Sequence, residues 1–177
     1  GDEYSIMIAS KHGKSIRFME SDVRCQGRVA SGVTGIKLKK DDEVVGMIAS
    51  NKKSDKVLVL MENGLGKSTP ITGYRIQKRG GSGIKAANVT PKTGMVVGLV
   101  ALSGQKGDIL MMSLNGVTLR LSVDSVPNQG RSTQGVYLMR LSDDDKVVTL
   151  SFIPCTETKQ AESEEVAQAQ TLIASSE

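Results

Sequence analysis

Aromatic residues are scarce in this chain of 177 residues, which contains three Tyr, two Phe and no Trp. A hydrophobic core must therefore be built from aliphatic side chains and from the eight Met. Prolines are also few, four against 19 glycines, and this ratio indicates many tight turns rather than a low-complexity linker.

Cysteine and histidine are too few for the sites that these residues usually build. Cys25 and Cys155 lie far apart and have no metal-ligand spacing, so we expect two reduced thiols and no disulfide framework. The single histidine, His12, is expected in a hairpin turn without a nucleophile partner. The acidic runs 41–43 and 143–145 occupy the same turn of two repeats, which favours solvation over metal binding. The sequence therefore predicts no catalytic and no metal site.

Long apolar runs are absent as well. No stretch approaches the ~20 apolar residues of a membrane span, and the first residues lack the apolar region of a signal peptide. We therefore expect no membrane partner.

The charges of the chain are distributed unevenly. Residues 156–177 contain five acids and one base, a net charge of −4, and because the whole chain carries +4, residues 1–155 carry +8. A basic body with an acidic tail suggests a polyanionic partner and a tail that competes with it. The tail has no strand pattern, so we expect it to be disordered or to form a short helix.

The pattern Gln-x-Arg-x-x-x-Gly occurs three times, at residues 26–32, 77–83 and 129–135. We call these segments the first, second and third loops. Their glutamines lie 51 and then 52 residues apart, and a period of this size indicates structural repeats.

Around each loop the sequence predicts about four short strands, in repeats 2–50, 54–103 and 106–153. The first two strands of each repeat are joined by a turn with glycine at one register, Gly13, Gly64 or Gly116. Four short strands per unit are typical of a propeller blade. We therefore predict an all-β fold of three four-stranded blades over residues 1–155, followed by the acidic tail.

The loops are the predicted binding surface. The arginine fork suits phosphate oxygens, and neighbouring glycines let an anion approach the backbone. The predicted DNA-binding residues are Arg17, Arg24, Arg28, Lys37, Lys67, Arg75, Lys78, Arg79, Lys85, Arg120 and Arg131. A structural interpretation stays open, in which the repeated arginine links blades by pairing with acids such as Asp22 or Asp124, and the repeated glycine and glutamine shape the loop.

Residues 64–69 resemble the end of a phosphate-binding P-loop. That motif needs a glycine where Met61 stands and a helix afterwards, but Pro70 and the strand pattern argue against a helix. We therefore predict no nucleotide site here and interpret Lys67 as another surface cation.

The second loop, Gln77, Lys78, Arg79, Gly80, Gly81, Ser82 and Gly83, resembles the signature box of the C-terminal domain of the bacterial DNA gyrase A protein. It differs from the usual Gln-Arg-Arg-Gly-Gly-Lys-Gly at Lys78 and Ser82. Residues 130–136 with 145–148 resemble the last blade of that domain, and residues 24–35 with 42–45 resemble an earlier one. The resemblance covers residues 2–155.

This resemblance implies a partial β-pinwheel, the last three blades, with DNA bent around its basic outer rim to support negative supercoiling. It implies duplex DNA, the rest of the gyrase A protein and the gyrase B protein of the heterotetramer as partners, and the bacterial cytoplasm and nucleoid as location. ATP and Mg²⁺ would belong to other parts of the enzyme, so this chain alone is expected to be a monomer without enzymatic activity.

Three other interpretations stay open at this point. The chain also fits the C-terminal domain of the topoisomerase IV C protein, which has fewer blades and wraps DNA more weakly. A protein-binding propeller, such as one built from regulator-of-chromosome-condensation repeats, has a similar period. An autonomous three-blade protein would complete a ring from two chains.

Overall fold

The computed structural model describes residues 3–53, 55–142 and 144–155. The predictions for the acidic tail, residues 156–177, lie outside the described residues. In the described part, strands and three single-turn 3₁₀ segments are the regular elements, and no α-helix occurs there. The prediction of an all-β chain is confirmed.

Each repeat starts with an antiparallel hairpin. The first repeat contains β1 (Ser5–Ser10), β2 (Lys14–Met19) and β3 (Val44–Ser50). The second contains β4 (Lys56–Met61), β5 (Leu65–Pro70), β6 (Ile84–Lys85) and β7 (Val96–Leu102). The third contains β8 (Gly107–Ser113), β9 (Thr118–Ser122), β10 (Val136–Tyr137) and β11 (Val147–Pro154). A 3₁₀ turn follows the second strand of each repeat, at Glu20–Asp22, Ile71–Gly73 and Val123–Ser125.

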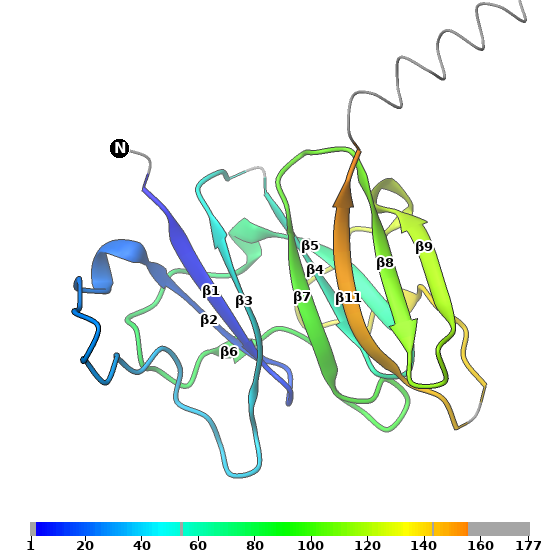
Figure 1. Cartoon of the computed structure of the whole chain (residues 1–177), viewed down its shortest axis with the longest axis horizontal. Coiled ribbons are helices and arrows are strands. Elements are labelled where there is room, and N and C mark those ends of the chain that lie inside the picture. The colour runs from blue at the N-terminus through cyan, green and yellow to red at the C-terminus, as the bar shows by residue number, and fades with distance from the viewer. Residues whose placement is uncertain (1–2, 54, 143, 156–177) are drawn as a thin grey trace, which may run out of the picture.

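The strands form three antiparallel sheets, which lie side by side in chain order (Figure 1). The first sheet has the order β3-β1-β2-β6 and the second has the order β10-β5-β4-β7. The fourth strand of each of these sheets comes from the following repeat, because β6 pairs with β2 and β10 pairs with β5. The third sheet, β11-β8-β9, has three strands in the described part of the chain.

This exchange of strands corrects the expectation that each repeat builds its own blade. Residues 33–39, which lie between the first loop and β3, form no strand in the structure. They occupy the position that β6 and β10 hold in the later repeats, and the described residues include no preceding sheet on which they can pair.

The hydrophobic core lies between the sheets, and β4 supplies both halves of it. Val57, Val59 and Met61 pack into the core between the first and second sheets. Leu58 and Leu60 point the other way, into the core shared with the third sheet. All five side chains are buried, as the nearly continuous apolar run predicts for a strand covered on both faces. The strand β7 packs against both β3 and β11 and so joins the three sheets.

Candidate nucleic-acid interface

The second loop starts beside the first sheet and docks on the first repeat. Its backbone enters through a bond of 2.7 Å from Gln77 N–H to the carbonyl of Arg17 on β2. The amide of Lys37 then donates to the carbonyl of Gly81 at 2.9 Å, and that of Gly80 donates to Gly35 at 2.8 Å. The loop therefore fills the corner between β2 and residues 35–37.

The third loop docks on the second repeat in the same way. Gln129 N–H donates to the carbonyl of Ser68 on β5 at 2.7 Å, and Asn88 N–H donates to the carbonyl of Thr133 at 3.3 Å. Ser68 and Asn88 hold the same repeat positions as Arg17 and Lys37. The repeat register read from the sequence is therefore also the register of the contacts.

Glycine is required at the end of both docked loops. Gly83 has φ +68°, and a Cβ atom there would lie 2.3 Å from the carbonyl oxygen of Ser15. Gly135 has φ +86°, and its Cβ would lie 2.5 Å from the carbonyl oxygen of Gly66. A side chain at either position would meet both an unfavourable backbone conformation and fixed backbone atoms.

The repeated arginine links its loop to residues that flank the loop of the preceding repeat. Arg79 donates through Nη1 to the carbonyl of Thr34 at 2.6 Å and through Nε to that of Asp22 at 3.3 Å. Arg131 donates through Nη1 to the carbonyl of Lys85 at 2.8 Å, and Lys85 is the repeat equivalent of Thr34. The arginine thus joins repeats as the structural interpretation expected, but through backbone oxygens instead of carboxylates. Arg28 in the first loop is exposed.

Lys67 corrects the expectation of a surface cation. Its side chain on β5 is fully buried, with 0% exposure. The ammonium group donates to the carbonyls of Gly130 and Thr133, both at 2.9 Å, and to that of Arg131. Burial, followed by the charges of Arg131 and Lys85, lowers the pKa of Lys67 to about 8. Lys67 therefore supports the third loop from inside.

The side chains of two further predicted cations bond to other groups of the protein. Arg17 is half-buried and donates to Ser5 Oγ at 2.9 Å and to the carbonyls of Ile71 and Tyr74 at 3.0 and 3.2 Å. Burial lowers the pKa of Arg17, and Asp55 partly offsets this effect. Arg120 forms an ion pair with Asp108 at 2.5 Å.

The remaining predicted cations stay exposed, and none forms an ion pair within the described residues: Arg24, Arg28, Lys37, Arg75, Lys78 and Lys85. All six lie within or beside the first two loops. Six of the predicted cations therefore remain exposed and without an ion pair around the first two loops.

The structure adds Lys14, which the sequence did not single out. Lys14 lies directly opposite Lys85 in the β2–β6 pair. At the equivalent place in the second sheet, Leu65 lies opposite Tyr137. No sequence signal connects two lysines 71 positions apart, because they meet only through the exchanged strand.

The family of this chain is now evident from comparison. The sequence profile described as "DNA gyrase C-terminal domain, beta-propeller" matches residues 4–51, 55–103 and 107–154. The chain belongs to this family. The predicted resemblance to the C-terminal domain of the DNA gyrase A protein is confirmed.

Similar proteins and solved structures support the same family assignment. The DNA gyrase A protein of Staphylococcus aureus (strain MRSA252) is 44% identical over 149 residues, which cover 84% of this chain and 17% of that protein. A "Structure of DNA gyrase A C-terminal domain" superposes with a TM-score of 0.76 at 31% identity, over 86% of this chain and 51% of that one. A crystal structure of the C-terminal domain of DNA topoisomerase IV superposes with a TM-score of 0.79 over 85% of this chain and 46% of that one, and at 18% identity it shows the fold alone.

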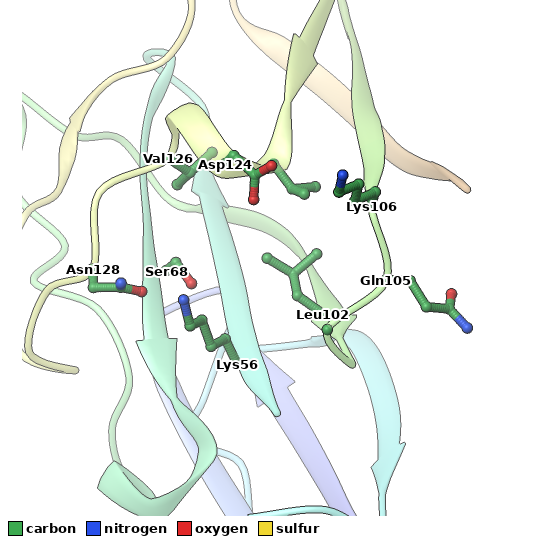
Figure 2. Close-up of a pocket in the computed structure, with 10 residues that line it drawn as sticks. Lys56, Ser68, Leu102, Gln105, Lys106, Asp124, Val126 and Asn128 are labelled. Carbon is green, nitrogen blue, oxygen red and sulfur yellow. The ribbon is translucent and has the colours of Figure 1, made fainter. Parts of the chain in front are cut away.

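A cleft lies between the second and third sheets of this gyrase domain. It encloses about 160 Å³, and Figure 2 shows Lys56, Lys106 and Asp124 among the residues that line it. The described residues contain no group of three His, Cys, Asp or Glu side chains that could hold a metal ion. Within the same residues, no helix has the length and apolar character of a membrane span.

Proposed function

We propose that this chain binds duplex DNA along the outer edge of its sheets and bends it, as part of the gyrase A protein, so that the enzyme can introduce negative supercoils. The observation that carries the proposal is the opposed pair Lys14 and Lys85 on β2 and β6. Like charges directly opposite each other destabilise a sheet, and phosphate groups close to the pair would remove that cost. Lys37 and Lys78 add exposed charge beside the same edge.

The proposed binding is largely independent of base sequence. Lysine and arginine side chains on an exposed edge reach phosphate oxygens, which carry no sequence information directly. Each phosphate neutralised on duplex DNA contributes about 0.9 to the slope of log affinity against log salt concentration. We therefore expect a steep salt dependence and little preference among sequences.

The proposal includes the partners and cofactors of the longer enzyme. The chain spans 17% of the length of the Staphylococcus aureus relative. We propose that the rest of the gyrase A protein and the gyrase B protein carry the DNA cleavage and the ATP-dependent steps with Mg²⁺, and that this chain supplies DNA geometry as a monomeric module in the bacterial cytoplasm. The intact gyrase A protein, together with the gyrase B protein, would then supercoil relaxed plasmid in an ATP-dependent reaction.

A double charge reversal, Lys78→Glu with Lys85→Glu, tests the DNA-binding edge. Both side chains are exposed, whereas Arg79 holds the loop and is unsuitable. If each lysine neutralises one phosphate, the salt slope falls by about 2 and affinity falls with it. Fluorescence anisotropy with labelled duplex measures both, and energy transfer between the duplex ends measures bending. Lys106→Glu, a reversal on the exposed start of the third repeat, is the control. Equal affinity and slope in the double variant and the wild type would contradict the proposal.

A further inference from the structure

We propose that Lys67 is a positioning residue for the third loop, in which its buried ammonium group occupies the place of a bound cation and orders the backbone that carries Arg131. Lys67 touches no DNA in this proposal. Its effect on DNA rests on the proposed function, whereas its effect on the loop does not.

The oxygens around the ammonium group come almost entirely from one loop. Lys67 extends from β5 and donates to the carbonyls of Gly130, Arg131 and Thr133 and, at 3.3 Å, to Thr133 Oγ1. The same hydroxyl donates to Gln129 Oε1 at 2.9 Å, so Gln129 is tied into the arrangement. An ammonium group has three N–H donors and no acceptor, and here every donor points at loop oxygens. The loop is thus wrapped around a positive charge.

The second loop shows that the fold itself does not need this cation. Ile16 on β2 is the repeat equivalent of Lys67, and it is also fully buried. A Cβ built at Gly81 in the second loop would lie 3.5 Å from Ile16 Cδ1, so an apolar side chain supports that loop. Lys67 therefore has a role that is specific to the third loop.

The charges around Lys67 link the loop to anions. The positive charges of Arg131 and Lys85 repel the ammonium group of Lys67 and contribute to its lowered pKa. Lys67 forms no ion pair with a carboxylate in the described residues. A lysine beside two other positively charged groups holds its proton less readily than an isolated lysine. A phosphate at Arg131 or Lys85 would offset part of that repulsion and favour the protonated form of Lys67. DNA binding at about pH 8 should therefore take up a fraction of a proton.

The first test replaces the cation and keeps the volume, with Lys67→Met in the full chain and Lys106→Met as the control with the same change of net charge. Hydrogen exchange is measured without DNA at the amides of residues 129–135. We expect at least about tenfold faster exchange in the Lys67 variant, since a charge-assisted hydrogen bond is worth more than 1.4 kcal/mol, and no change in the control. Unchanged protection would overturn the proposal.

Rescue by a small cation separates this role from simple packing. Lys67→Ala leaves space for methylammonium, which should restore protection of residues 129–135, whereas methanol of similar size should not. Equal rescue by both compounds, or by neither in a variant that unfolds cooperatively like the wild type, would overturn the proposal. If the alanine variant does not fold, the methionine variant decides.

Calorimetry of DNA binding in buffers of different ionisation enthalpy tests the proton coupling. At about pH 8 the wild type should take up a fraction of a proton, and Lys67→Met should take up less. Equal uptake in both would overturn the coupling. Absence of DNA binding by the wild type would contradict the proposed function and leave the hydrogen-exchange test of Lys67 valid.

Discussion

The second and third loops follow the same backbone path but rest on different side chains. Each enters through the backbone amide of its glutamine and leaves through a glycine in the left-handed region. The arginine of each loop bonds to a backbone oxygen just after the preceding loop. Beneath the second loop lies Ile16, and beneath the third lies the charged Lys67. The outer edges next to them also differ, because the first sheet pairs Lys14 with Lys85 and the second pairs Leu65 with Tyr137. One backbone design thus supports two electrostatic environments, a free cationic edge and an enclosed cation.

The largest effect is expected from breaking the shared exit of the loops. Gly83→Ala places a methyl group 2.3 Å from the carbonyl oxygen of Ser15 and keeps an unfavourable φ, so we expect a loss of about 3 kcal/mol or more in unfolding free energy. Gly32→Ala is the control, because Gly32 has φ +80° but no atom within 4 Å of the added carbon. That variant should lose about 1 kcal/mol. Urea denaturation measures both, and equal losses would contradict the role of close packing.

The stability of the chain at alkaline pH should depend on Lys67 beneath the third loop, but not on the apolar Ile16 beneath the second. The pKa of Lys67 is lowered to about 8 in the folded chain, from 10.5. Below about 8 both states hold the proton. Between 8 and 10.5 the unfolded state binds more protons, so the Lys67 contribution to stability rises with pH. The unfolding free energy of the wild type minus that of Lys67→Met should rise by on the order of 2 kcal/mol over this range. A flat difference would show that Lys67 titrates normally.

Arg17 and Arg120 extend the comparison to the first and third sheets. They hold the same repeat position, but Arg17 is half-buried with three protein acceptors, whereas the Arg120 side chain is 54% exposed and paired with Asp108. Arg17→Met should cost about 2 kcal/mol because buried acceptors lose their donor. Arg120→Met should cost less than about 1 kcal/mol, as exposed ion pairs do. Equal costs in urea denaturation would contradict this distinction.

The smallest effect is expected at the arginine that links the second loop to the first repeat. Arg79→Ala removes two bonds to backbone oxygens of the first repeat and should destabilise the chain by about 1 kcal/mol, because the site is partly exposed. Arg28→Ala, at the same position of the exposed first loop, should change stability by less than about 0.5 kcal/mol. Thermal unfolding of the two variants gives the comparison, and a larger loss for Arg28 would reverse it.

The class of fold and the register of the repeats can be predicted from the sequence. Periodic Gln, Arg and Gly residues mark equivalent loops, and the apolar run of β4 predicts a strand that is buried on both faces. These features are local or periodic, so spacing alone reveals them. The pattern also marks Gly83 and Gly135 as candidates for shaping the loop, but the carbonyl oxygens that exclude a side chain there belong to other strands.

Tertiary structure alone decided which repeat completes each sheet and which cations remain free. The short strands β6 and β10 pair with the preceding repeat, and hydrogen bonds between distant segments leave no trace in local spacing. The same exchange brings Lys14 opposite Lys85 and encloses Lys67 with the carbonyls of the third loop. The sequence does not show whether the charge of a lysine faces water or loop oxygens, because tertiary packing decides how far its side chain is buried.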